Sequence, residues 1–241
     1  MTLLAVERIK LFSTRSPWWC SATALALTIG FAAMMGWAVD GGMSLSQALS
    51  GYQFGLMVVL VLAALAVTTE YRFGTIRATF QAAPNRTAVL LAKAGVVAAL
   101  AFVLGELAAF GSWGVAQLLA PGPELAVSTA TEWRQLVGIG PLFALAAVLA
   151  VGVGALLRQT AGAVTLLIIW SLLVEQLILL VPNIGPDLQE WMPFTVGARF
   201  LQSDLMGGDP PLGPWGSLAY FAAVAFAVLA TAAVVVHRRD A

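Results

Sequence analysis

The residues of this sequence that could do chemistry gather in a polar stretch between two apolar runs, from Glu70 to Lys93. Four of the chain's twelve lysines and arginines fall in it: Arg72, Arg77, Arg86 and Lys93. A segment of this kind does not sit in hydrocarbon, and a short basic loop between membrane spans is expected to face the cytoplasm. The chemistry available to it is therefore recognition of a soluble partner or of anionic lipid headgroups.

Patterns for catalysis and for cofactor binding are missing from the sequence. A phosphate-binding loop needs a lysine directly after a glycine, and neither Lys10 nor Lys93, the only lysines, follows one. No His-Glu-x-x-His pair and no Gly-x-Ser-x-Gly turn occurs. One cysteine, Cys20, and one histidine, His237, leave almost no material for a metal site. We expect no enzyme, and no catalytic, cofactor-binding or metal-binding residues; the functional sites must be surfaces and pathways.

Composition predicts the class of protein to which these surfaces belong. With 60% apolar residues, 10% charged residues and a mean hydropathy of +0.91, the chain has too little polar surface for a soluble globule. Six apolar runs approach or exceed the ~20 residues that a bilayer requires. They cover residues 18–39, 51–69, 90–119, 136–157, 161–181 and 218–236. The sequence therefore predicts an all-α, polytopic membrane protein with a single transmembrane domain over residues 1–241.

Two segments outside the spans carry further expectations. The first sixteen residues predict a short interfacial helix with Glu7, Lys10 and Arg15, although their apolar side chains form no clean stripe. Residues 182–217 are rich in proline, and their apolar segments are too short to cross a bilayer. We expect them to form short re-entrant helices in the outer leaflet before the last span.

The positive charges predict the orientation. If the N-terminus is inside, ten of the twelve lie on the inner side: Arg8, Lys10, Arg15, Arg72, Arg77, Arg86, Lys93, Arg158, Arg238 and Arg239. Only Arg134 and Arg199 lie outside. The positive-inside rule then places both termini in the cytoplasm, in a multi-pass protein of the plasma membrane.

Two acidic residues, Glu106 and Glu175, are predicted to lie within spans, each toward the outer half. An ionisable group at that depth is costly and is a functional candidate by default. One hypothesis is that they line a substrate path that favours cationic amphiphiles. The alternative is that they lie near the outer interface, are hydrogen-bonded between helices, or are protonated.

Two patterns resemble those of ABC-2 type permeases, the membrane subunits of a large class of ATP-driven exporters. The first resembles the family's opening and reads Glu7-x-x-Lys10-x-x-Ser13-x-Arg15-Ser16, followed by Trp18-Trp19. The second is similar to its cytoplasmic coupling segment and reads Glu70-Tyr71-x-x-Gly74-Thr75-Ile76-Arg77, then Pro84-x-Arg86 and Lys93. The resemblance extends over the chain in span count, inside termini and a long outer segment before the last span.

The resemblance implies a set of partners. A separate cytoplasmic ABC ATPase subunit would bind ATP and Mg²⁺, so this chain would need no cofactor. A second permease subunit, identical or related, would complete the pathway through the lipid bilayer. The substrate would be a small hydrophobic or amphiphilic molecule such as a drug or a lipid, and nucleic acid would not be a partner.

The resemblance also implies an ATPase-coupling site, made of Glu70, Arg72, Gly74, Thr75, Arg77, Pro84 and Arg86. Glu70 would close the second span, and would cap or pair with Arg72 or Arg77. Gly74 would permit a close backbone approach or a turn, and Thr75 would cap a short helix that follows it. Arg77 and Arg86 would bind acidic groups of the ATPase or lipid headgroups, or would only fix the topology.

Two other functions stay open. A secondary transporter could be driven by protons through Glu106 and Glu175, although no internal repeats are evident in the sequence. A regulatory or immunity membrane subunit could bind an ATPase and export nothing.

Overall fold

The computed structural model describes residues 2–39, 42–83, 85–201 and 211–238, and all regular structure in these ranges is helical. Six helical segments are long and apolar enough to cross a membrane by length and composition. They are Ser16–Ala38, Leu45–Arg72, Arg86–Leu119, Ile139–Leu157, Thr160–Leu180 and Pro214–Arg238. The predicted all-α fold with six spans is confirmed, with boundaries that shift by up to six residues.

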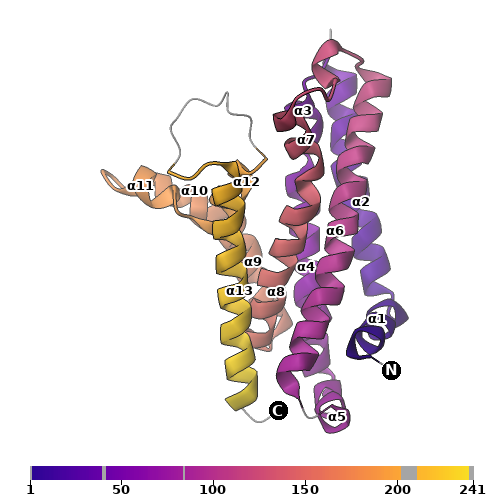
Figure 1. Cartoon of the computed structure of the whole chain (residues 1–241), viewed down its shortest axis with the longest axis vertical. Coiled ribbons are helices and arrows are strands. Elements are labelled where there is room, and N and C mark those ends of the chain that lie inside the picture. The colour runs from indigo at the N-terminus through magenta and orange to yellow at the C-terminus, as the bar shows by residue number, and fades with distance from the viewer. Residues whose placement is uncertain (1, 40–41, 84, 202–210, 239–241) are drawn as a thin grey trace.

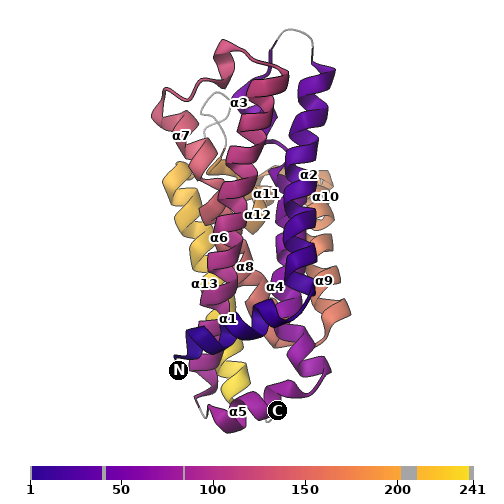
Figure 2. The same cartoon turned by 90° about the vertical axis from the view of Figure 1, so that its right-hand side faces the viewer.

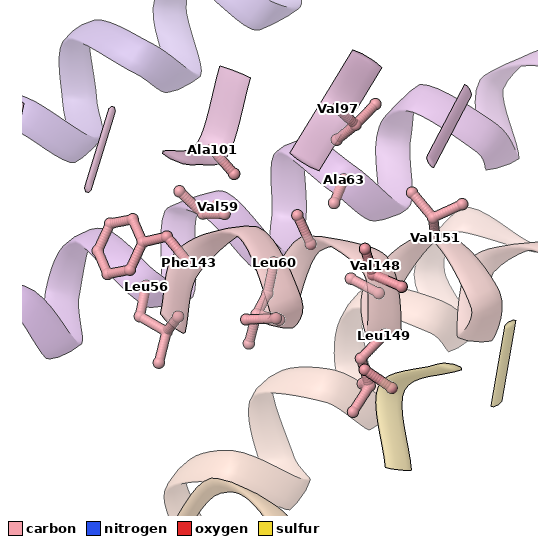
Figure 3. Close-up of a cluster of buried hydrophobic side chains, with 14 of the residues drawn as sticks. Leu56, Val59, Leu60, Ala63, Val97, Ala101, Phe143, Val148, Leu149 and Val151 are labelled. Atoms are coloured by element: carbon pink, nitrogen blue, oxygen red, sulfur yellow. The ribbon is translucent and has the colours of Figure 1, made fainter. Parts of the chain in front are cut away.

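The fourth span, α8 (Ile139–Leu157), is the centre of the bundle. It packs against α4 (Tyr52–Arg72), α6 (Arg86–Leu119), α9 (Thr160–Ile169) and α13 (Pro214–Arg238). In the most apolar 18-residue stretch of each span, 72% of the residues are buried for α8, against 17% for the fifth span. The apolar contacts between α4, α6 and α8 include Val59, Val97 and Phe143, all buried (Figure 3).

Small residues let α6 approach α8 closely. A Cβ atom on Gly105 of α6 would lie only 2.7 Å from the Cα atom of Gly140 of α8. The two backbones therefore touch at this crossing, as small residues allow between helices in a membrane.

The first, fifth and sixth spans lie at the periphery of the bundle (Figure 1). The fifth is not one regular helix. After α9 it continues as a π-helical turn over Trp170–Val174, a short α10 (Glu175–Leu177) and a 3₁₀ turn, η3 (Ile178–Leu180). A π turn inside a helix is rare and shifts the face on which later side chains lie.

One end of the bundle carries two short helices. Helix α1 (Leu3–Ser13) lies across the lower ends of α4 and α6, and α5 (Thr75–Ala82) lies below them (Figure 2). The C-terminal end of α13 reaches the same level (Figure 1). We call this the α5 end of the bundle.

The opposite end is closed by α3 (Leu45–Leu49), η1 (Pro123–Leu125), α7 (Ala130–Val137), α11 (Gly185–Gln189) and α12 (Pro193–Arg199). Capping boxes begin α3 at Ser44 and α7 at Thr129. Helices α11 and α12 are too short to cross a bilayer, as the sequence predicts for this segment.

Candidate functional site

A sharp turn joins α4 to α5. Gly74 has a φ of +70°, the left-handed region that a residue with a Cβ atom adopts only under strain. No atom lies within 4 Å of the position that a Cβ would occupy, so the backbone conformation, not a clash, favours glycine here. Gly74 therefore lies in a turn, as predicted.

The predicted cap by Thr75 is wrong. Gly74 occupies the N-cap position of α5, and Thr75 is the first residue of the helix. The Thr75 hydroxyl instead donates to the backbone oxygen of Glu70, at 3.4 Å. The reason is the left-handed Gly74, which starts the helix one residue earlier than a threonine cap would.

The predicted pairing of Glu70 with Arg72 or Arg77 is also wrong. Glu70 Oε1 lies 2.8 Å from Lys93 Nζ and 3.4 Å from Lys10 Nζ. The reason is that Glu70 faces the crevice between α4, α6 and α1, whereas both arginines lie on the exposed side of the turn. Two residues predicted for the interfacial helix thereby belong to the same group as Glu70.

Four charged side chains form this group, which we call the ionic cluster: Glu7, Lys10, Glu70 and Lys93. Glu7 Oε1 accepts a hydrogen bond from Lys10 at 2.8 Å, and Glu7 Oε2 accepts one from Lys93. Two positive and two negative charges balance, which makes their burial tolerable. Only 3% of the Glu7 side chain and 7% of the Lys93 side chain are exposed.

The ionic cluster connects four helices. Glu7 and Lys10 come from α1, Glu70 from α4 and Lys93 from α6. Lys10 also donates to the hydroxyl of Thr79 in α5, at 2.9 Å. Sequence reasoning missed this partnership, although the only two lysines of an otherwise apolar chain were a signal for it.

The arginines of the turn divide into two kinds. Arg72 and Arg77 are exposed, and the guanidinium of Arg72 lies 5.6 Å from the ring of the exposed Phe73. Arg86 lies 5.3 Å from the ring of Phe80 and donates to the backbone oxygen of Val236, at 3.3 Å. Arg86 therefore holds α5, α6 and α13 together, which leaves Arg72 and Arg77 as the outward charges.

Two predicted residues lie apart from the ionic cluster. Arg15 is the exposed N-cap residue of α2 (Ser16–Ala38), at the turn from α1. Pro84 lies outside the described residues.

A cavity of about 520 Å³ lies beside the ionic cluster, between α1, α4 and α6. Its walls carry the four charged side chains at one end and apolar residues of α4 and α6, among them Leu62, Leu65 and Val96, at the other.

The two acids within the spans are placed on different helices. Glu106, on α6, packs against Gly140, and its Oε1 atom is buried without a hydrogen-bond partner among the described residues. Glu175 is buried, and its carboxylate accepts hydrogen bonds from the backbone N–H groups of Phe194 and Thr195, at 2.9 and 2.7 Å. Glu175 therefore caps the N-terminus of α12.

Glu175 also lines a second cavity, of about 320 Å³, together with Tyr52, Gln53 and Gln176. Glu106 lines neither of these two cavities, so the two acids do not form one site. No group of three or more potential metal ligands occurs among the residues that the structure describes.

Comparison with models of known protein families and with curated proteins gives no match. The class follows from the fold and composition instead. Six long apolar helices indicate a multi-pass, all-helical membrane protein, with a polar site at one end of the bundle.

Proposed function

We propose that this chain is the membrane subunit of an ATP-driven exporter of the ABC-2 type. A separate cytoplasmic ATPase subunit hydrolyses ATP, and a second permease subunit, identical or related, completes the pathway. The substrate is a small hydrophobic or amphiphilic molecule, such as a drug or a lipid. The protein lies in the plasma membrane with the α5 end in the cytoplasm, and α11 and α12 re-enter the outer leaflet.

The arrangement of α5 is the observation that carries this proposal. Helix α5 lies at the end of the bundle that α1 and the last turn of α13 share, where the positive charges also collect. Its Ile76 is buried against the bundle, while Phe73 and Arg77 beside it are exposed. A short helix with an anchored inner face and an outward arginine, preceded by an exposed aromatic ring, suits docking onto a soluble partner.

The contacts of α5 also support a role in transmission. Lys10 joins Thr79 of α5 to the ionic cluster, and Arg86 joins Phe80 of α5 to α13. A displacement of α5 by the ATPase would therefore act on α1, α4, α6 and α13 together. Transport by rigid-body motion of this kind needs packed helices with two arrangements, not chemistry in the membrane.

Reversal of the outward charge tests the proposal. The double variant Phe73→Ala, Arg77→Glu should no longer bind the ATPase, because it removes the exposed ring and opposes the acidic groups that an arginine would bind. The matched control is Glu124→Lys, an exposed charge reversal at the opposite end. The readouts are co-purification of the ATPase and ATP-dependent transport in vesicles. Equal ATPase binding by both variants and the unchanged chain would refute the proposal.

A proton-coupled transporter is the second candidate, because one oxygen of Glu106, within the apolar helix α6, is buried without a hydrogen-bond partner among the residues that the structure describes. The requirement for ATP distinguishes the exporter from the proton-coupled transporter. Transport that continues without ATP and collapses with the proton gradient would favour the second candidate. ATP hydrolysis by the complex without any transport would instead indicate a regulatory or immunity subunit.

A further inference from the structure

The cavity beside the ionic cluster is amphiphilic. Polar side chains of α1, of the turn into α2 and of α5 line one end: Lys10, Ser13, Thr14, Ser16 and Thr75. Apolar side chains of α4 and α6 line the other: Leu62, Leu65, Ala66, Val96 and Val97. Its volume of about 520 Å³ falls within the roughly 300–1,000 Å³ typical of sites for small ligands.

Among the four charges of the ionic cluster, Lys10 is the one that a ligand can reach. Its side chain is 33% exposed, against 12% for Glu70, 7% for Lys93 and 3% for Glu7. One carboxylate oxygen of the cluster, Glu70 Oε2, has no hydrogen-bond partner within the described part of the chain, and it is itself buried. The accessible charge in this cavity is therefore positive.

Lys10 also retains hydrogen-bonding capacity. An ammonium group has three N–H donors, and two of them are used by Glu7 and Thr79. The nearest oxygen of Glu70 lies at 3.4 Å, beyond the 2.7–3.2 Å of an ordinary N–H···O bond. One donor remains for an acceptor, and an anionic acceptor is the strongest.

The position of the cavity matches the boundary between headgroups and hydrocarbon. Helix α1 lies across the ends of the spans (Figure 2), and the exposed rings of Phe12 and Trp18 at its C-terminal end contact each other in a tilted arrangement, with 5.5 Å between their centroids. Aromatic side chains favour this boundary. From there the apolar wall follows α4 and α6 into the bundle region.

We propose that this cavity binds one phospholipid of the bilayer, with the phosphate beside Lys10 and an acyl chain along Leu62, Leu65 and Val96. The bound phospholipid fills the crevice under α1 and so holds α1 against α4 and α6. The site does not depend on export, because it requires only that the chain lies in a membrane.

Native mass spectrometry of the purified chain with added dioleoyl phosphatidylglycerol tests the site. Lys10→Gln should retain roughly fivefold less lipid, the factor that one lysine near an anionic lipid surface contributes. Lys10→Arg should retain the lipid. The matched control is Arg8→Gln, an equal loss of charge on the exposed face of the same helix, which should also retain it.

A second pair of variants leaves the ionic cluster intact, in case Lys10→Gln does not fold. Ala66→Trp should obstruct the apolar part of the cavity, where the acyl chain would lie, and abolish retention. Ala99→Trp, on an exposed position of α6, should retain the lipid. Dioleoylglycerol, which has the acyl chains but no phosphate, should not bind, and inorganic phosphate should not displace the phospholipid.

Each contrary result would overturn the proposal. Equal losses in Lys10→Gln and Arg8→Gln would indicate general surface charge. Retention by Ala66→Trp would place the lipid elsewhere, and retention of dioleoylglycerol would indicate an apolar groove without headgroup recognition. Displacement of the phospholipid by inorganic phosphate would indicate a site for a free anion.

Discussion

The ammonium group of Lys93 lies 2.8 Å from the carboxylate of Glu70, so the start of α6 is bonded to the end of α4 across the polar stretch that joins them. The same ammonium group contacts Glu7 of α1, 86 residues away in the sequence. The ion pair between Glu70 and Lys93 therefore closes the segment between them into a loop, and this loop contains α5.

Substitution of Lys93 tests whether the ion pairs that close this loop stabilise the fold. Lys93→Met leaves Glu7 and Glu70 as buried carboxylates with one cation fewer, and removal of one partner from a buried pair costs about 3–5 kcal/mol. We expect that loss in the free energy of unfolding, measured with a denaturant in detergent. Arg77→Met, an equal change at an exposed site, should cost no more than ~0.5 kcal/mol. Similar values for both variants would show that the ionic cluster does not stabilise the fold.

The effect of a substitution at Gly74 on the stability of the fold should depend on the backbone conformation of this residue alone. Gly74→Ala places a Cβ atom in open space but keeps φ at +70°, which costs about 1–2 kcal/mol for an ordinary L-residue. Gly74→Asn should cost less, because asparagine tolerates this region.

The control for Gly74 is Gly114, which also has nothing within 4 Å of a Cβ but lies inside helix α6. Gly114→Ala should stabilise by roughly 0.5–1 kcal/mol. Thermal unfolding of the three variants measures the contrast. Equal effects of alanine at both glycines would contradict the left-handed turn.

We expect the primary role of Glu175 to be in the stability of the fold and not in transport. Glu175→Leu leaves the N–H groups of Phe194 and Thr195 without their carboxylate acceptor, a loss of about 1–3 kcal/mol. Gln176→Leu, its exposed neighbour in the same cavity, should leave stability unchanged. If this cavity is part of the substrate path, Gln176→Leu should nevertheless alter the substrate range.

Helix α7 should lose its cap in acid. The pKa of the Glu132 carboxyl is lowered, chiefly by the hydrogen bond from the backbone N–H of Thr129 and next by that from Ser128. A lowered pKa in the folded state means that the stabilisation is fully present above the unfolded value of about 4.3. It is lost as the pH falls through the lower, folded value.

Amide hydrogen exchange at Ser128 and Thr129, whose N–H groups donate to Glu132, measures this effect. Protection of these amides should persist at neutral pH and fall as the pH drops below about 4. In Glu132→Ala this step in the pH profile should disappear, because alanine cannot accept the two hydrogen bonds. The same step in the variant would assign it to another group.

Much of the fold could be predicted from the sequence, because a span needs about twenty apolar residues and the chain separates its spans by polar turns. The turn at Gly74 could also be predicted, since a glycine after the last polar residues of a span signals a reversal. The break in the fifth span could not, because residues 160–180 form a mainly apolar run whose few polar residues, Thr160, Thr165, Ser171, Glu175 and Gln176, include no proline and do not indicate a π turn. Its π turn becomes intelligible only once Glu175 is seen to reach α12.

The partners of Glu70 could not be predicted for a different reason. Local spacing offered Arg72 and Arg77, each within one or two helical turns. Of the observed partners, Lys93 comes within reach because α6 packs beside α4, and Lys10 because α1 folds back across both helices. No local pattern encodes that fold-back, so long-range ion pairs stay outside the scope of motif reasoning.

At 34 residues and ~1.5 Å per residue, α6 is about 51 Å long, against ~30 Å of hydrocarbon. It touches α8 backbone to backbone at Gly105 and Gly140, far from either tip. At that contact no side chain separates the two backbones. If α6 pivoted about this contact, its part with Lys93 and its part with Trp113 would move in opposite directions. A displacement on one side of the membrane would then produce the opposite displacement on the other side.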